Sequence, residues 1–378
     1  METWLPAGSL WRLEGVAEGP EMQEAARPIA SAVAVDVAIV AGVPDEIDLA
    51  AARADSAHLF LRRAWYEAAG HSGVRTVIAA RPDGAVIAAL PTAPTRWPGM
   101  RLVPGSYWPF RSFPVDADIA DSELAAMLSS SAVRKALGPV WRMGPVYEND
   151  PTLIRLLRIC AGSGWTPLPR RIAPSFLLDI DRLQADGSWP RGSTLRKNRF
   201  HEKHLATHGD LEWRFVSGAG WTSEVFDDLA EIERRSWVAD RTDGSDAKFM
   251  APHHRRVWEG AAADPVLAEA MRAAILYIGG APAAFSFDLD AGSIKYAIAN
   301  SYDERFAKHS PGKCLYYRNL VEAMERGIAI VDWGAGDSGY KRTIGADEGP
   351  GIVDLLFVGN AALARVIAPI WRRSGRKG

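Results

Sequence analysis

Four consecutive residues, Ser310 to Lys313, could bind an anion if they stand at the start of a helix. Serine is preferred just before the first helical turn, and Pro311 suits the first helical position, where an N–H has no helical partner. Gly312 has no side chain, so a phosphate could approach the backbone N–H groups closely, and Lys313 adds a positive charge. These N–H groups and the positive end of the helix dipole attract phosphate. The motif indicates a phosphate site, although a helix that is simply well capped would have the same sequence.

A second polar segment follows the next predicted strand. In open α/β sheets, ligands collect beyond the carboxyl ends of the strands, so this segment is typical of a polar crevice; a solvated turn is the alternative. Because the two segments flank one β–α–β unit, the fold should bring them together. The segment combines three glycines with two carboxylates, a phenol and an amine: Asp332, Asp337, Tyr340 and Lys341.

The composition of the 378-residue chain is that of an ordinary globular protein, with 48% hydrophobic and 24% charged residues. A net charge of -2 does not indicate nucleic-acid or membrane binding. Two cysteines, Cys160 and Cys314, are too few for a disulfide framework. The sequence shows neither a secretory signal nor an apolar run of the roughly 20 residues that a bilayer requires. We therefore expect a cytoplasmic protein of two domains.

The two halves of the chain repeat one order of elements: a strand, helices, an antiparallel meander and a β–α–β crossing. In the first half, 33–40 predicts a buried strand, 45–69 a helix, and Asp83-Gly84 a hairpin. This order predicts two similar α/β domains with a boundary between residues 161 and 192. The predicted organisation is a poorly ordered leader (1–30), a first domain (31–175) and a second domain (176–378) that ends in a basic tail.

The two polar segments resemble the signature of the CelD-like acetyltransferases. These belong to the GNAT superfamily and are associated with the synthesis of cellulose and other exopolysaccharides. Tyr302-Asp303, Ser310–Lys313 and the run from Asp332 to Lys341 carry the resemblance, which extends from about Ser193 to Gly345. The basic segment Ser193–Arg199 is similar to the helix before the acyltransferase core of that family. Two residues depart from the family pattern and concern the acceptor specificity: Ala335 and Ile344.

The resemblance implies an α/β protein with tandem GNAT folds, each a mixed, mostly antiparallel twisted sheet flanked by helices. The first domain would be a degenerate copy without a phosphate loop, as in FemAB-type transferases. Acetyl-CoA or another acyl-CoA would be the co-substrate, and no metal is expected. Its pyrophosphate would lie on Ser310, Pro311, Gly312 and Lys313, and its pantetheine arm along the strand 294–300, which includes Ala299 and Asn300.

The resemblance also implies direct attack of an acceptor amine or hydroxyl on the thioester, which requires a base and stabilisation of an oxyanion. Asp337 is the first candidate for the base or acceptor clamp. Asp332 is the second, unless its carboxylate holds the glycine loop by hydrogen bonds. Tyr340 would protonate the leaving thiolate. Lys341 would stabilise the oxyanion or hold an acceptor phosphate, unless it is a surface lysine.

Three residues are candidates for binding the acceptor: Trp237, which could stack on a sugar ring, Glu231 and Arg196. Trp237 could instead be a core residue. The helix of Arg196 also carries three histidines, which leave open a metal site, a site for a nucleotide or phosphorylated sugar, or a solvated face. No carboxylate or thiolate partner is fixed for a metal. The three histidines of this helix are His201, His204 and His208.

We therefore expect an acyl-CoA-dependent N- or O-acyltransferase that acts on a sugar or polysaccharide precursor. One alternative is a FemAB-type aminoacyl transferase that uses charged tRNA, which the modest net charge disfavours. Another is a non-catalytic GNAT scaffold that binds a ligand in exopolysaccharide synthesis, which Asp337, Tyr340 and Lys341 disfavour. We expect no nucleic-acid partner. Peripheral membrane association and the oligomeric state stay open, and Cys314 is predicted to be a packing residue rather than a nucleophile.

Overall fold

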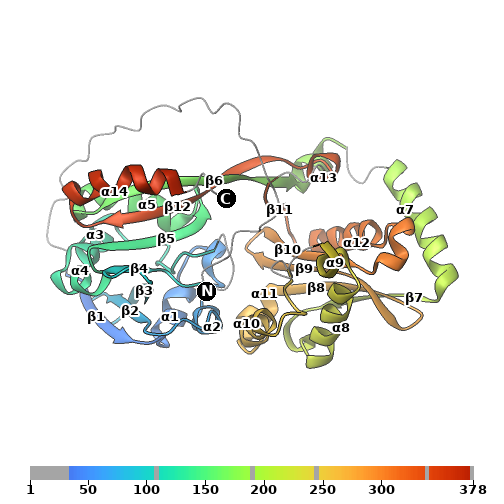
Figure 1. Ribbon diagram of the computed structural model, residues 1–378, viewed down its shortest axis with the longest axis horizontal. Helices are drawn as coiled ribbons and strands as arrows, with labels where there is room; N and C mark the ends of the chain where they lie inside the picture. Colours follow the sequence, from blue (N-terminus) through green and yellow to red (C-terminus); the bar gives the residue numbers. More distant parts are fainter. Residues whose placement is uncertain (1–33, 106–109, 188–191, 242–246, 337–339, 375–378) are drawn as a thin grey trace. The chain divides into compact units, whose positions relative to one another are not determined.

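The computed structural model describes residues 34–105, 110–187, 192–241, 247–336 and 340–374. Asp337 and the predicted leader 1–30 lie outside these residues. The chain forms two compact units, each described by itself below (Figure 1). Unit 1 comprises the chain up to Asp55, His71–Ile172 and the chain from Gly351, and unit 2 comprises Ser56–Gly70 and Ala173–Pro350.

Unit 1 is a mixed sheet in which the antiparallel pairs predominate. The predicted hairpin at Asp83-Gly84 is confirmed: β2 and β3 pair antiparallel, and Gly84 adopts a φ of +85°, which glycine tolerates. β1 is present, but the prediction that it is buried is wrong, because it lies at the edge of the sheet and four of its six residues are exposed. The strands in sheet order are β1 (Asp36–Ala41), β2 (Arg75–Ala80), β3 (Val86–Pro94), β4 (Met100–Leu102), β5 (Val140–Tyr147), the end of β12 (Asp347–Val358) and the start of β6 (Thr166–Asp179).

Helices pack on this sheet through small clusters of apolar side chains. α14 covers β5 and β12, where Ile367 and Trp371 pack on Val140 and Leu356. The single helix predicted for 45–69 is wrong. The chain forms α1, then a 3₁₀ turn and α2, and the last two belong to unit 2. The helices of unit 1 are α1 (Glu46–Ala52), α3 (Asp121–Ser129), α4 (Ser131–Leu137), α5 (Pro151–Ser163) and α14 (Ala361–Ser374).

Unit 2 is also a mixed, mostly antiparallel sheet. Its strands β7 to β10 form an antiparallel meander, β10 and β11 are parallel, and β11 is antiparallel to β6. The order is the end of β6, then β11 (Ile330–Ala335), β10 (Ile294–Tyr302), β9 (Ala281–Ala291), β8 (Met271–Ile278) and β7 (Leu211–Val216). Its helices are α2 (Arg63–Ala68), α6 (Ile180–Ala185), α7 (Gly192–Leu205), α8 (Ser223–Arg234), α9 (Trp237–Arg241), α10 (Pro252–Ala262), α11 (Pro265–Ala270), α12 (Pro311–Glu325) and α13 (Tyr340–Thr343).

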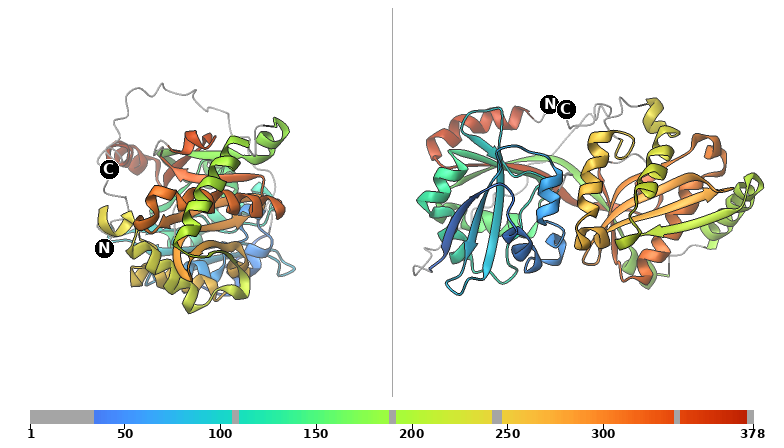
Figure 2. Two further views of the ribbon diagram at one scale, coloured as in Figure 1. Left: turned by 90° about the vertical axis from the view of Figure 1, so that its right-hand side faces the viewer. Right: turned by 90° about the horizontal axis from the view of Figure 1, so that it is seen from below.

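Helices cover both faces of the unit 2 sheet (Figures 1 and 2). Successive residues of a strand point to opposite faces, and β9 shows this alternation. Ala284 packs with Leu315 of α12 on one face, whereas Phe285 and Phe287 pack with Phe249 on the face of α8. The position of α12 therefore depends on an apolar core that the strand period specifies.

A buried polar network also fixes α12 on the sheet. The Lys295 Nζ atom of β10 lies 3.0 Å from Asp288 Oδ2 of β9, and the Asn319 Nδ2 atom of α12 donates to the same oxygen at 2.8 Å. Lys295 and Asp288 are each 1% exposed, so the removal of either partner would leave a buried charge. The network holds the middle of α12 at one place above β9 and β10.

The division into units differs from the predicted domains in two places. The chain does pass from one unit to the other near the predicted boundary, between Ile172 and Ala173. However, Ser56–Gly70 belongs to unit 2, and the chain from Gly351 belongs to unit 1 because β12 pairs antiparallel with β5. Among the described helices, none is long and apolar enough to cross a bilayer.

Candidate functional site

The parallel strands β10 and β11 pair only at their beginnings. Their register runs from Ile294↔Ile330 to Tyr296↔Asp332, and further along, β10 pairs with β9 alone and β11 with β6 alone among the described residues. β10 contains a bulge between Ala297 and Ala299, which changes the direction of the strand where the pairing ends. The carboxyl ends of two adjacent parallel strands therefore part from each other, and the backbone of 297–302 has no strand partner on the β11 side within the described part of the chain.

The segment that connects β10 to α12 begins the helix at Ser310. Ser310 has a φ of +50°, the left-handed region, and is the one non-glycine residue with positive φ in the described chain. Such strain is typical of functional loops. Its carbonyl accepts from the N–H groups of Lys313 (3.0 Å) and Cys314 (3.3 Å), and Pro311 has no N–H. The first turn therefore leaves the N–H of Gly312 and the exposed ammonium of Lys313 for a ligand.

Gly312 is in close contact with the end of β10. A Cβ atom at this position would lie 3.2 Å from Cδ1 of Tyr302, closer than an ordinary van der Waals contact. A larger side chain would therefore either displace Tyr302 or project over the helix start.

Asp303 anchors the 3₁₀ turn Glu304–His309 that leads into Ser310. It is 1% exposed, and its Oδ1 atom accepts from the backbone N–H of Arg305 at 2.9 Å. The carbonyl of Arg235, at the end of α8, accepts from the N–H of Glu304 at 3.1 Å. Burial acts to raise the pKa of Asp303, but the hydrogen bonds from Arg305 outweigh it, so the pKa is lowered and the carboxylate stays charged.

At the end of β11, Asp332 and Lys341 both bind backbone groups. The Asp332 Oδ1 atom accepts from the N–H of Gly334 at 2.6 Å, which matches the second role that the sequence left open for this residue. Lys341 is 5% exposed, so the alternative of a surface lysine is wrong. Its Nζ atom donates to the carbonyls of Trp333 (2.7 Å), Gly334 (3.1 Å) and Ala335 (3.0 Å). Three carbonyls match the three N–H donors of an ammonium, so Lys341 fixes the strand end and has no donor left for an oxyanion.

The structure thus brings most of the predicted donor-site residues to one end of two adjacent strands. Ala299 and the exposed Asn300 lie on the part of β10 that pairs with β9 and not with β11 among the described residues, the turn 310–313 follows that strand, and Asp332 of β11 forms the last pair with β10. Tyr340 is the first residue of α13, and its side chain, like Asp337, lies outside the described part of the structure. The roles of Asp337 as base and Tyr340 as acid stay predictions.

The predicted acceptor residues lie on other elements. Trp237 begins α9 and is 37% exposed, so it is not a core residue. Glu231 of α8 forms ion pairs with Arg234 and Arg235 and has less freedom to bind an acceptor than the sequence suggested. Arg196 is exposed on α7.

Two further residues shape this region in ways that the sequence alone did not assign to them. Glu233 is 1% exposed, and its carboxylate accepts from the backbone N–H groups of Lys248, Phe249 and Met250, each at 2.8 Å. It thereby holds the segment that follows α9, although no sequence signal distinguishes it from its neighbours in α8. His309 precedes the Ser-Pro-Gly-Lys motif and packs against α7, a position that the motif itself could have indicated.

The cysteine next to this turn has a packing role, as predicted. Cys314 is fully buried, and burial raises the pKa of its thiol to about 12, so it is neutral at pH 7. Within the described residues, no group of three or more His, Cys, Asp or Glu side chains could hold a metal ion.

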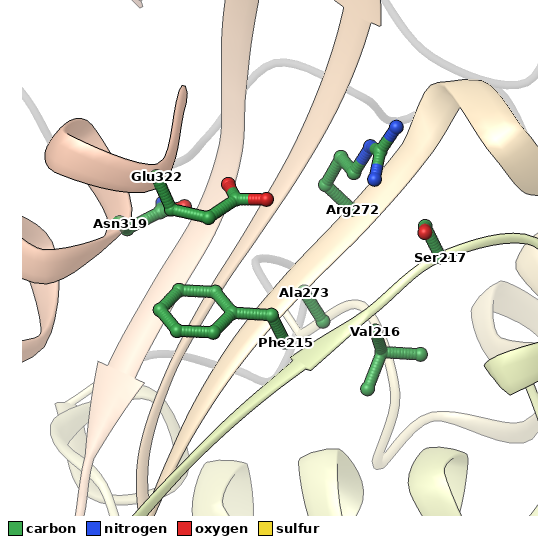
Figure 3. A pocket seen from close by; sticks show the side chains of 7 residues that line it. All are labelled: Phe215, Val216, Ser217, Arg272, Ala273, Asn319 and Glu322. Carbon is green, nitrogen blue, oxygen red and sulfur yellow. The ribbon is translucent and has the colours of Figure 1, made fainter. Parts of the chain in front are cut away.

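A cavity of about 250 Å³ lies on another flank of α12, between this helix, the end of β7 and the start of β8 (Figure 3). Its charged members have partners of their own: Glu322 binds Arg326, and Arg272 binds Glu269. Glu322 lies about three turns along α12 from Gly312. The cavity is thus separate from the donor site, and we place the chemistry at the strand ends instead.

Residues 192–342 match the model of a family described as acetyltransferase (GNAT) domain. The match includes Ser310–Lys313, the parting strands β10 and β11, and the strand end at Asp332. The second unit contains a GNAT acetyltransferase domain, and the chain is an acyltransferase. This agrees with the site geometry, because the matched residues include the start of α12 and the parallel strands β10 and β11 on either side of it.

Two solved structures show the same fold. The crystal structure of FemX is 13% identical, and the alignment covers 88% of this chain and 100% of that chain with a TM-score of 0.59. The structure of L-PGS from Bacillus licheniformis is 11% identical, with coverage of 88% and 97% and a TM-score of 0.53. The sequence has no significant match among curated proteins. The predicted fold class, GNAT-like units with mixed, mostly antiparallel sheets flanked by helices, is confirmed.

Proposed function

We propose that the protein transfers an acyl group, in the simplest case acetyl, from acyl-CoA to an amine or hydroxyl of a sugar or polysaccharide precursor. The observation that carries this proposal is the start of α12, where a strained serine, a glycine N–H and an exposed lysine meet beside two parting strands. A helix start attracts phosphate, and a parted strand pair leaves backbone donors and acceptors for an amide-containing arm. The CelD-like resemblance of the motif supports an acceptor in exopolysaccharide synthesis.

In the proposed reaction, the acceptor nitrogen or oxygen attacks the thioester carbonyl carbon, and the carbon–sulfur bond breaks. The proton of the attacking group passes to a base, for which we propose Asp337, and the thiolate takes a proton from Tyr340. The unpaired edge of β10 would position the thioester by backbone hydrogen bonds. Lys341 and Asp332 contribute by holding the end of β11, so they are positioning residues in this proposal.

The proposed donor site is tested by substituting Gly312. Gly312→Glu places a carboxylate over the helix start, where it repels a pyrophosphate. We expect coenzyme A to bind at least about 100-fold more weakly in calorimetric titration. Ala362→Glu is the matched control, because Ala362 is the exposed second residue of α14, as Gly312 is the second residue of α12. The control should bind within twofold of the wild type. Equal affinity of Gly312→Glu and the control would overturn the proposed site.

Binding and turnover measurements also distinguish two alternatives to this activity. The exposed basic residues of α7 favour charged tRNA as a second candidate donor, in the manner of a FemAB-type aminoacyl transferase. Steep salt dependence of binding to charged tRNA, without binding of coenzyme A, would support that activity. Tight coenzyme A binding without release of free thiol from acetyl-CoA, for any sugar-nucleotide or lipid-linked acceptor, would support a non-catalytic scaffold.

A further inference from the structure

Helix α14 lies on the sheet of unit 1 (Figure 1) and has apolar side chains on two of its faces. Ile367 and Trp371 face the sheet, where they pack in the cluster that includes Leu356 of β12. The Cζ atom of Arg170 lies 3.9 Å from the centre of the Trp371 ring, which fixes the rotation of the helix about its own axis. The opposite side of α14 therefore points out of unit 1.

The outward side of α14 carries an apolar stripe. Val366 and Ile370 lie one turn apart and are 66% and 67% exposed, which makes them the most exposed large hydrophobic side chains in the described part of the chain. Ala362 precedes them by one turn, and Pro369 falls on the same side by its helical spacing; both are exposed. Single exposed apolar residues are ordinary, whereas a contiguous stripe along one helix indicates a contact surface.

Arginines border this stripe. Arg365 and Arg372 lie two turns apart along one edge of it, and Arg373 continues it at the carboxyl end of the helix. All three are exposed, and none forms an ion pair with a carboxylate among the described residues. Asp354 is the last acidic residue of the sequence and is fully buried, so its charge is not at this surface. The outward side of α14 therefore combines apolar area with a local excess of positive charge, which the net charge of -2 for the whole chain conceals.

The charge pattern decides which kind of partner fits this surface. A second copy of the chain would place the same patch on both sides of a two-fold interface, so the arginines of one copy would face those of the other. Like charges that meet in this way are unfavourable. An anionic bilayer instead offers negative headgroups to the arginines and the boundary of its acyl chains to the apolar stripe. Arginine suits this position, because its stem covers apolar surface while its charged group reaches the headgroups.

We propose that α14 docks the protein on the surface of a bilayer that contains anionic phospholipid. The helix lies parallel to the surface, with Val366 and Ile370 at the boundary between headgroups and acyl chains, and its arginines bind lipid phosphates. Its 14 residues span about 21 Å, less than the roughly 30 Å of a hydrocarbon core, so the helix lies on the membrane and does not cross it. The inference does not rest on the proposed function, because docking involves unit 1 and no acyl donor.

Helix α5 provides matched control positions on the other face of the same sheet. Trp141 of β5 alternates with the residues beneath α14, so its ring lies on the far face, where it contacts Trp165. The indole N–H of Trp165 donates to the carbonyl of Leu128 in α3, and α3 packs against α5. A bilayer that contacts α14 cannot contact α5 at the same time. The control residues on α5 are Ile154, which is 42% exposed, and Arg158, whose side chain is 57% exposed.

The test measures sedimentation of the full chain with vesicles of phosphatidylglycerol mixed with phosphatidylcholine, and with vesicles of phosphatidylcholine alone. We expect binding to the anionic vesicles to be at least about tenfold stronger and to weaken as salt is added. Ile370→Ser should bind about tenfold more weakly, and Arg372→Gln about fivefold more weakly on the anionic vesicles only. The matched controls Ile154→Ser and Arg158→Gln should bind within about twofold of the wild type.

Three results would overturn the proposal. The first is equal binding of the wild type to the two kinds of vesicle, and the second is an equal loss of binding in the α14 variants and the α5 controls. The third is a dimer that Ile370→Ser dissociates in sedimentation velocity, without vesicle binding by the wild type, because a second copy would then cover the stripe. Thermal melts of Ile370→Ser and Arg372→Gln should match the wild type, since both side chains point out of unit 1. Neither measurement involves coenzyme A, so a failure of the proposed acyl transfer would leave the result unchanged.

Discussion

Each unit contains two parallel strands that are connected through a helix: β4 and β5 in unit 1, and β10 and β11 in unit 2. The first turn of the connecting helix differs between the two units. In unit 2, β10 leads to α12, which begins with Ser310-Pro311 and has cationic side chains around it. In unit 1, β4 leads to α3, and β4 pairs in parallel with β5 over three residues, as β10 does with β11. The two units thus share a strand–helix–strand arrangement that could place an anion at the same point.

In unit 1 the protein itself supplies that anion. The Glu123 Oε2 atom accepts from the backbone N–H of Ala120 at 2.8 Å, and Arg81 binds the same carboxylate at 2.7 and 3.1 Å. The hydrogen bond from Arg81 is the main reason why the pKa of Glu123 is lowered, so the group stays charged. Asp121 adds a second carboxylate in the first turn.

The same backbone arrangement therefore carries its own carboxylate at the helix start in unit 1, whereas the helix start in unit 2 is left for a ligand. A phosphate at the start of α3 would meet two negative charges, whereas at the start of α12 it would meet several positive ones. This gives a physical reason for the expectation that the first half of the chain has lost its phosphate loop.

Charge reversal at the closed helix start should have the largest effect. Glu123→Lys removes the cap, takes from Arg81 its closer carboxylate while Asp116 stays at 3.6 Å, and places a positive charge at the positive end of α3. We expect a loss of about 3 kcal/mol in the free energy of unfolding, measured by urea denaturation. Asp118→Lys, an exposed charge reversal nearby, should cost less than about 0.5 kcal/mol. If Glu123→Lys also weakened coenzyme A binding more than twofold in the folded protein, the comparison between the units would be wrong.

The end of β11 allows a smaller test in unit 2. Lys341→Met fills a similar volume but leaves three carbonyls without their donor, so we expect a loss of about 2 kcal/mol. In unit 1 the corresponding strand, β5, pairs with β12 up to Tyr147↔Ile352. Transfer activity should fall together with the folded fraction and recover at low temperature. Complete loss of activity in a fully folded Lys341→Met protein would instead restore the oxyanion role.

Lowering the pH should destabilise unit 2 through His254. This is the smallest of the three effects that we expect on the free energy of unfolding. Burial is the main cause that lowers the pKa of His254 to about 4, although Nδ1 lies 2.5 Å from the carbonyl oxygen of Ala247. The unfolded chain takes up the proton near pH 6.5, so the stabilisation is present above that pH and is lost as the pH falls toward 4. We expect the free energy of unfolding at pH 5.5 to be about 1 kcal/mol lower than at pH 7. Circular dichroism of urea unfolding would measure it, and stability that is equal at the two pH values would contradict this assignment.

The helix start at Ser310 and the hairpin at Asp83-Gly84 could be predicted because they depend on residues within one turn of each other. A proline at the first helical position and a glycine with positive φ act locally, whatever the rest of the chain does. The two polar segments could be placed together because a β–α–β crossing brings them to the same edge of the sheet. Glu233 could not be recognised, since its three N–H partners lie 15 to 17 residues away in a segment without a motif.

By itself, therefore, the sequence determined the helix start at Ser310, the hairpin at Asp83-Gly84 and the strand–helix–strand order around α12, because short-range sterics and periodicity govern these. Only the tertiary structure decided that Lys341 turns inward to three carbonyls, that His309 meets His204 of α7, and that the chain from Gly351 joins unit 1. Each of these depends on contacts between residues that are not neighbours in the sequence, and the spacing along the chain does not specify which of them meet. The same composition of charges could have faced solvent, and packing placed them around one helix start.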